Sequence, residues 1–145
     1  MTEKVKIINK SGNPLPKYTH NSDSGLDICA SLKEDIILAP GTRVLIPTDI
    51  YVALPEDYEF QVRSRSGLAL KSGIFVLNSP GTIDEGYRNS IGVILYNSSQ
   101  DEFIIKNGDR IAQLVLQKVP KVIWEEVDYL VDTDRGLNGY GSSGV

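Results

Sequence analysis

One carboxylate, Asp84, lies in a glycine-flanked segment that could hold it beside a bound ligand. The segment reads Gly81-Thr-Ile-Asp84-Glu-Gly-Tyr87-Arg88, and its glycines allow a tight hairpin whose backbone amides approach a ligand closely. A carboxylate three residues before an aromatic ring can act as a base next to a flat stacking surface. Taken alone, the segment is more often an ordinary polar β-turn in which the tyrosine covers the core.

Two further segments carry side chains that could contact a ligand. Arg63-Ser-Arg65-Ser66-Gly67 leads into a short helix predicted over Ser64–Ser72, where free N–H groups and the helix dipole favour an anion. Gln113 interrupts an apolar strand face, so its amide needs a hydrogen-bond partner either in the core or on a ligand. The plain alternatives are solvated arginines beside a capped helix and a core hydrogen bond for the glutamine.

The last ten residues differ from the rest of the chain, because residues 136–145 include four glycines and two serines. Such a segment is too flexible to order itself in water. It carries Tyr140, Ser142 and Ser143, and Arg135 directly precedes it. Fully extended, ten residues span roughly 30 Å, enough to reach a neighbouring subunit. Together, these cations, hydroxyls, aromatic rings and one carboxylate suit a nucleotide phosphoanhydride better than a sugar or a peptide.

Short strands separated by turns must position these groups. The apolar segments are rich in Val, Ile and Tyr and alternate with Gly, Pro and Asn turn signals. They cover residues 5–8, 36–38, 44–46, 51–54, 58–62, 74–77, 91–96, 103–105, 111–116 and 122–124. This pattern predicts an all-β domain over residues 1–134, with 135–145 as a flexible segment of the same domain. The stretch 91–96 is apolar on both faces, which predicts a cover on each side, one of them from another subunit.

Composition argues against several other classes of protein. The 145 residues carry a net charge of -4 and no apolar run long enough to span a bilayer, so neither nucleic acid nor a membrane is an expected partner. No signal-peptide stretch opens the chain, and a cytoplasmic location is expected. One cysteine, Cys29, and one histidine, His20, cannot form an intrachain disulfide or a typical zinc site. A Cys–His nucleophile pair is conceivable, but Cys29 fits a small buried residue better.

Five motifs follow one another along the chain. They are Ser24-Gly-Leu-Asp27-Ile-Cys-Ala30, Arg65-Ser66-Gly67-Leu68-Ala69, Gly81-Thr-Ile-Asp84-Glu-Gly-Tyr87-Arg88, Gly108-Asp-Arg-Ile-Ala-Gln113-Leu114 and Arg135-Gly-Leu-Asn-Gly-Tyr140-Gly-Ser-Ser-Gly144. In this order they resemble the trimeric dUTP pyrophosphatases, or dUTPases. The resemblance implies a distorted jelly-roll barrel with one short helix, assembled as a homotrimer with shared sites and a flexible Gly-rich C-terminal lid. It also implies Mg²⁺-assisted hydrolysis of dUTP to dUMP and pyrophosphate, which keeps uracil out of DNA and supplies dUMP for thymidylate synthesis.

The same resemblance implies roles for individual residues. Asp84 would hold and deprotonate the water that attacks the α-phosphorus. Mg²⁺ would bind through the triphosphate and water, and Asp27 would reach it at most through a water molecule. Tyr87 would leave no room for a 2′-hydroxyl, and Tyr140 would stack on uracil. The residues expected to contact dUTP are Arg65, Ser66, Gly67, Asn78, Thr82, Ile83, Tyr87, Gly92, Gln113, Arg135, Tyr140, Ser142 and Ser143.

Two other functions remain open from the sequence. A dCTP deaminase shares the fold, but it would need a further acid–base group aimed at the cytosine 4-position, and residues 83–87 read as in the hydrolases. A regulatory module that docks to another protein is also compatible with every motif. The chain departs from the family pattern at four positions, which predicts altered lid kinetics and an unchanged reaction. These positions are Asn89, Asn138, Tyr140 and Ser143.

Overall fold

The computed structural model of the protein describes residues 2–144, which contain eleven short strands and one helix. Their bounds in chain order are β1 (Lys6–Asn9), β2 (Leu26–Cys29), β3 (Ile36–Leu38), β4 (Arg43–Pro47), β5 (Ile50–Ala53), β6 (Tyr58–Arg63), α1 (Ser66–Ser72), β7 (Ile74–Val76), β8 (Gly81–Ile83), β9 (Gly92–Asn97), β10 (Phe103–Ile105) and β11 (Arg110–Lys118). The predicted β architecture with one short helix is confirmed. Among the described residues, no helix has the length and apolar character needed to cross a membrane.

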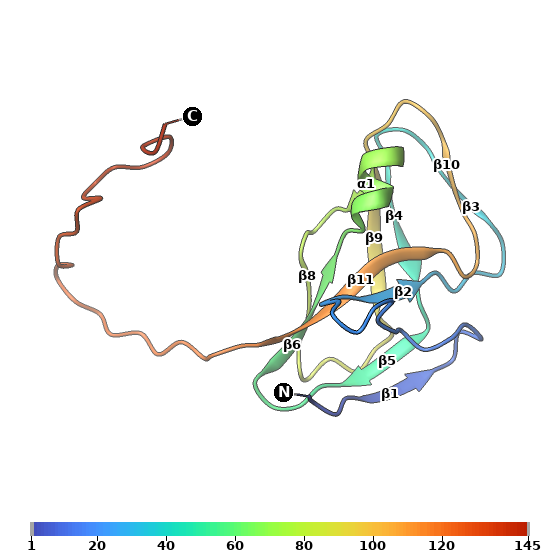
Figure 1. The fold of residues 1–145 in the computed structure, drawn as a ribbon, viewed down its shortest axis with the longest axis horizontal. Helices are drawn as coiled ribbons and strands as arrows, with labels where there is room; N and C mark the ends of the chain where they lie inside the picture. The colour runs from blue at the N-terminus through green and yellow to red at the C-terminus, as the bar shows by residue number, and fades with distance from the viewer. Residues whose placement is uncertain (1, 145) are drawn as a thin grey trace.

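The strands pair antiparallel and form four separate sheets (Figure 1). The largest has the order β2-β11-β6-β8 and the next β4-β9-β7, while β1 pairs with β5 and β3 with β10. The expectation of a barrel needs correction, because within residues 2–144 no sheet closes on itself. All strands except β11 are only three to six residues long. Each strand therefore pairs with its neighbours over a few residues only, and in the described part of the chain the edge strands of each larger sheet stay unpaired with one another.

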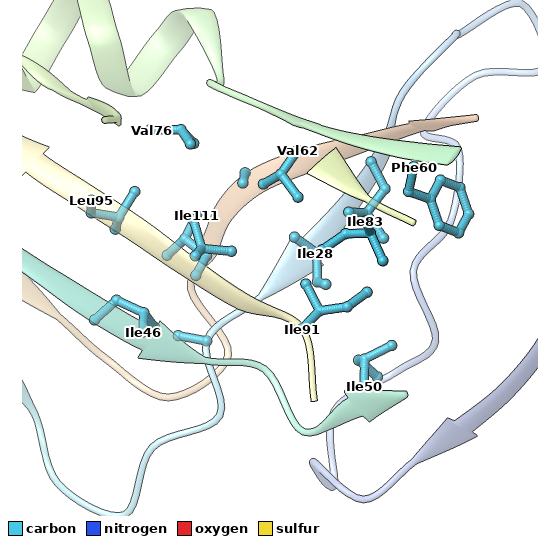
Figure 2. Close-up of a cluster of buried hydrophobic side chains, with 14 of the residues drawn as sticks. Ile28, Ile46, Ile50, Phe60, Val62, Val76, Ile83, Ile91, Leu95 and Ile111 are labelled. Carbon is cyan, nitrogen blue, oxygen red and sulfur yellow. The ribbon is translucent and has the colours of Figure 1, made fainter. Parts of the chain in front are cut away.

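The apolar core lies between the two larger sheets (Figure 2). Val62 and Ile83 project into it from β6 and β8, and Ile46 and Leu95 project from β4 and β9. Removal of these side chains from water is the main driving force for packing the sheets together. Strand β6 alternates, since Phe60 and Val62 are buried and the residues between and after them are not. The sheet that carries most of the candidate site is therefore fixed by the core on its inner face.

Helix α1 begins two residues later than predicted. Ser64 stays outside the helix because its Oγ accepts a hydrogen bond from the Val76 N–H at 2.9 Å, which ties this residue to β7. Arg65 is the extended residue that precedes the helix. The helix ends as predicted at Gly73, whose φ of 65° is left-handed and whose N–H donates to the Ala69 carbonyl.

Strands β2 and β8 are absent from the sequence prediction. Their sequences, LDIC and GTI, mix apolar residues with Asp and Gly, which are poor strand formers. They nevertheless pair with β11 and β6 at opposite edges of the four-stranded sheet. This pairing brings Asp27 on β2 and the Thr82–Ile83 pair on β8 into one sheet.

The chain after β11 extends away from the sheets (Figure 1). Residues 121–144, here called the C-terminal segment, are exposed throughout. The strand predicted over residues 122–124 is wrong for the described structure, because Ile123 and Trp124 are 94% and 90% exposed and lie outside every strand. A strand needs neighbours for its backbone groups, and within residues 2–144 this stretch pairs with no other strand. Beyond Lys121, the hydrogen bonds are local turns within the segment itself.

Candidate active site

A pocket of about 420 Å³ lies where β2, β11 and the start of α1 meet. We call it the anion pocket. It gathers three stretches far apart in sequence, two of which carry the expected phosphate binders. The residues that line it are Thr19, His20, Asp23, Ser24, Gly25, Asp27, Arg65, Ser66, Gly67, Arg110 and Gln113.

Asp27 holds two arginines side by side in the anion pocket. Its Oδ1 accepts a hydrogen bond from Arg65 Nε at 2.9 Å, and its Oδ2 accepts one from Arg110 Nη1 at 3.3 Å. Arg65 Nη1 also donates to the Arg110 carbonyl at 3.3 Å. The two guanidiniums and the Asp27 carboxylate together carry one net positive charge, while Asp23, the second carboxylate of the pocket, accepts the backbone N–H of His20. The Asp27 and Arg65 side chains are about three-quarters or more buried. The geometry is therefore suited to an anionic ligand, with Asp27 orienting Arg65 toward it.

Arg110 is one of the pocket residues that were not among the expected site residues. It opens β11 and pairs across the sheet with Cys29, and a shift of register follows between Arg110 and Ala112. Such a bulge re-aims the side chains next to it. The sequence feature that could have indicated Arg110 is its place at the start of a predicted strand, three residues before Gln113. In that segment only the glutamine was considered as a candidate.

Gln113 is fixed between the sheet and the loop before β2. It pairs with Asp27 on one side and Arg63 on the other, and its Nε2 donates to the Ser64 carbonyl at 2.9 Å. A Cβ added to Gly25 would lie only 2.0 Å from Gln113 Oε1, so glycine at this position allows the amide to occupy its place. The Gln113 amide therefore has a structural partner, as one alternative expected. It also lines the anion pocket, and its contact with a ligand stays a prediction.

A second, smaller pocket of about 170 Å³ lies between β8 and the start of β9. We call it the hairpin pocket. Five of the residues expected to contact dUTP line it together with apolar core residues: Asn78, Thr82, Ile83, Tyr87 and Gly92. The lining residues are Val62, Val76, Asn78, Gly81, Thr82, Ile83, Tyr87, Gly92, Val93 and Ile94. It shares no lining residue with the anion pocket.

Two glycines of the hairpin pocket lie against neighbouring side chains. A Cβ on Gly81 would lie 3.2 Å from Val62 Cβ and 3.3 Å from Asn78 Nδ2. A Cβ on Gly92 would lie 2.7 Å from Leu45 Cδ1. Gly81 is therefore tightly enclosed, whereas the contact at Gly92 is with the end of the exposed Leu45 side chain, which can move. Both glycines line the pocket.

Asp84 follows β8 directly and is exposed, outside the lining of both pockets. Within residues 2–144, its carboxylate makes no hydrogen bond to protein. The hairpin that carries it is well tied, since the Tyr87 N–H donates to the Asp84 carbonyl at 3.1 Å and the Tyr87 hydroxyl donates to the Ser90 carbonyl at 3.0 Å. Arg88 Nη1 also donates to the Glu85 carbonyl at 2.6 Å. The carboxylate is thus free to accept from a water molecule.

The four expected site residues of the C-terminal segment lie in neither pocket. Arg135, Tyr140, Ser142 and Ser143 are all exposed, and Arg135 Nε donates locally to the Asn138 carbonyl at 3.1 Å. The chain thus presents three separate groups of functional residues: the anion pocket, the hairpin pocket with Asp84, and the C-terminal segment.

A Cys–His pair is not formed. His20 Nδ1 lies 3.2 Å from Asp23 Oδ2, and the backbone N–H of His20 donates to the same carboxylate and lowers the pKa of Asp23. Burial, and then the nearby charge of Asp27, raise the pKa of the Cys29 thiol, which makes it a poor nucleophile. Cys29, predicted to be a small buried residue, is only partly buried.

Comparison with known proteins agrees with this fold. The dUTPase family model matches residues 12–144. The deoxyuridine 5'-triphosphate nucleotidohydrolase of Finegoldia magna is 50% identical over 141 residues, or 97% of this chain and 99% of the relative. The enzyme of the same name from Gloeothece citriformis is 53% identical over 131 residues, or 90% of this chain and 89% of the relative. This chain therefore belongs to the dUTPase family.

Solved structures agree in fold. The dUTPase of Staphylococcus bacteriophage 80alpha, solved with dUpNHpp, has a TM-score of 0.84 and 27% identity, with 99% of this chain and 100% of that chain covered. The dUTPase of phage phi11 of S. aureus coordinates a structural Mg(II) ion; its TM-score is 0.79 at 24% identity, with 88% of this chain and 99% of that chain covered.

Proposed function

We propose that this chain hydrolyses dUTP to dUMP and pyrophosphate by attack of water on the α-phosphorus. The enzyme class follows from the family and from relatives at 50% identity or more: the chain is a dUTP diphosphatase. The observation that carries the mechanism is the division of functional groups into a pocket with two arginines and a hairpin pocket beside one carboxylate that makes no hydrogen bond to residues 2–144. In the cell, this reaction would keep uracil out of DNA and supply dUMP for thymidylate synthesis.

Each active site would be completed by other copies of the chain in a homotrimer. The two pockets lie toward opposite edges of the four-stranded sheet, so one site needs the anion pocket of one protomer and the hairpin pocket of another. The outer face of the three-stranded sheet supports a partner surface. Leu45 and Ile94 pair across that face, and Leu45 is 63% exposed. An apolar sheet face of this kind is typical of a covered subunit interface.

Binding of the triphosphate would depend on the anion pocket. Arg65, held by Asp27, and the hydroxyl of Ser66 would donate hydrogen bonds to phosphate oxygens. The Gln113 amide would lie close to the α-phosphate. Arg110 would add a second cation. These groups align the chain of phosphates and neutralise charge, which is the main demand that phosphoryl-type displacement makes on a protein.

Selection of deoxyuridine would depend on the hairpin pocket. Asn78 and the backbone at Thr82 and Ile83 would match the donor and acceptor pattern of uracil, and Gly92 keeps the wall close. The narrow pocket would exclude a 5-methyl group, and the Tyr87 ring against the sugar would exclude a 2′-hydroxyl. Asp84 would then accept a proton from the attacking water.

The donor set fits a Mg²⁺ ion brought by the substrate. Among residues 2–144, no three Asp, Glu, His or Cys side chains cluster as a metal site. Both oxygens of Asp27 already accept from arginines, so this residue would reach an ion through water. Triphosphate oxygens and water are ligands that Mg²⁺ prefers. When bound, the ion would neutralise charge on the phosphates and on the leaving pyrophosphate.

Gly67→Ala is expected to raise KM for dUTP by about tenfold without destabilising the fold. No atom lies within 4 Å of a Cβ built at Gly67, and alanine favours a helix over glycine by about 1 kcal/mol. The added methyl group would instead occupy space where the phosphates approach. Steady-state kinetics and thermal unfolding check this, with Leu70→Ala in the same helix as the matched control. An unchanged KM would show that phosphates do not approach α1.

Gly25→Ala is expected to lower kcat/KM about tenfold by displacing Gln113, since the new methyl would clash with its Oε1. If the effect runs through Gln113, then Gly25→Ala should add little on top of Gln113→Ala. A double-mutant cycle on kcat/KM measures this. Fully additive losses would contradict the assignment.

The substrate is tested by pyrophosphate release from dUTP, dTTP, dCTP and UTP, each with and without Mg²⁺. The expected result is release from dUTP alone, with a strong gain on adding Mg²⁺. Ammonia released from dCTP would favour the deaminase alternative. Analogue binding without turnover of dUTP would favour a regulatory binding module.

A further inference from the structure

We propose that Glu85 is a positioning residue that holds the Asp84 hairpin in its working geometry by clamping it to the turn between β5 and β6. The inference rests on the proposed role of Asp84 as the base. It assigns to the side chain of Glu85 a function separate from binding substrate, since Glu85 lines neither pocket.

The clamp is a short hydrogen bond to a strained turn. The Asp57 N–H donates to Glu85 Oε2 at 2.6 Å. Asp57 has a φ of 63°, in the left-handed region that only glycine adopts freely. A bond to an ionised acceptor is stronger than a neutral one, so the carboxylate of Glu85 helps to keep Asp57 in this conformation and is itself held by it.

The same turn also holds the root of the C-terminal segment. The Asp57 carbonyl accepts a hydrogen bond from the Val119 N–H at 2.7 Å, directly after β11 pairs with β6 at Lys118 and Tyr58. Lys121 Nζ lies 4.0 Å from Glu85 Oε2. The backbone of Asp57 therefore joins the Asp84 hairpin on one side to the start of the C-terminal segment on the other.

Asp84 needs such an anchor because its own side chain touches no protein hydrogen-bond donor within residues 2–144. On its N-terminal side, Ile83 is buried and pairs with Phe60 in the sheet. On its C-terminal side, Glu85 is the first residue whose side chain is bound to another element. A base must lie within hydrogen-bond reach of its water, and a misplacement of about 1 Å from a remote change can lower the rate about 100-fold.

Two conservative changes, one shorter and one isosteric, separate the effect of side-chain length from the effect of charge. Glu85→Asp keeps the carboxylate but shortens the side chain by one methylene group, so it cannot reach the Asp57 N–H in this geometry. Glu85→Gln keeps an oxygen at the right distance but removes the charge. The proposal predicts that kcat for dUTP falls about 10-fold or more in Glu85→Asp and stays within about 3-fold of the wild type in Glu85→Gln. KM and the Kd of the analogue dUpNHpp should change less than about twofold in both.

Glu56→Ala is the matched control, since Glu56 is an exposed glutamate of the same turn and should leave kcat unchanged. Lys121→Ala tests whether the ion pair contributes, and the proposal expects at most a small effect because the pair is long and exposed. Thermal unfolding of each variant shows whether a loss of kcat reflects loss of fold. If Glu85→Asp does not fold, the proposal is tested by the kcat of Glu85→Gln and by the protection of the Asp57 amide from hydrogen exchange in that variant.

The opposite ranking would overturn the proposal: full kcat in Glu85→Asp, or a loss confined to Glu85→Gln, would assign an electrostatic role to the charge instead. If Glu85→Asp does not fold, a low kcat in Glu85→Gln, or a rapidly exchanging Asp57 amide in that variant, would also overturn the proposal. Asp84→Asn, measured in parallel, separates this failure from failure of the proposed function. If Asp84→Asn is inactive and Glu85→Asp is fully active, only the clamp is wrong. If Asp84→Asn retains turnover, the proposed base is wrong.

Discussion

Asp84→Asn is expected to lower kcat for dUTP by about 100- to 10,000-fold, the usual contribution of a positioned base. The carboxylate is exposed and free of protein hydrogen bonds in the described structure, so the amide should fit without loss of stability. Binding of dUpNHpp should be largely intact, because the contacts assigned to the base, sugar and phosphates lie elsewhere. Steady-state kinetics, analogue titration and thermal unfolding check the three statements.

Asp35→Asn is a suitable control for Asp84→Asn, because Asp35 is another exposed aspartate that directly precedes β3 and lies outside both pockets. It should behave like the wild type in all three measurements. Near-normal turnover by Asp84→Asn would remove this residue as the base and leave the proposed mechanism without one.

Deletion of residues 136–145 is expected to lower kcat/KM by about 100-fold or more while leaving the melting temperature unchanged. The fold should survive because residues 136–144 are exposed and form their hydrogen bonds within the C-terminal segment. Activity should collapse because closure of this segment would exclude water and bring Arg135 and Tyr140 onto the nucleotide. Kinetics and thermal unfolding of the truncated chain measure the two effects.

The matched control for the truncation is Leu137→Ala, which changes a fully exposed residue of the same segment without a proposed contact to dUTP. Its kcat/KM should be close to that of the wild type. A truncated enzyme that works at full rate would show that the C-terminal segment is not a lid.

Secondary structure was predictable from the sequence where periodicity and turn signals coincide. The alternation of β6 places Phe60 and Val62 in the core, and Gly73 ends α1 in the left-handed conformation that glycine favours. Prediction fails where structure depends on distant partners. Ser64 leaves the helix because of a hydrogen bond to Val76, and the apolar stretch around Trp124 has no strand beside it in residues 2–144.

The residue types of the candidate site were predictable, but their grouping was not. From the motifs, Asp27 was expected only to reach a metal ion through a water molecule. In the structure its carboxylate pairs with Arg65 and Arg110. The side chains of Arg110 and Glu85 form hydrogen bonds with residues more than 25 positions away, and the spacing of residues in the sequence does not predict such contacts. The split into two pockets likewise follows from the strand order β2-β11-β6-β8, which no local pattern encodes.

The most direct test is a crystal structure of the wild-type protein with dUpNHpp and Mg²⁺. The predicted result is one water molecule held by the Asp84 carboxylate at about 2.6–3.2 Å and aligned with the α-phosphorus, between the hairpin pocket of one protomer and the anion pocket of another. An ordered nucleotide with the Asp84 side chain turned away, and no water joining it to the α-phosphate, would contradict the account.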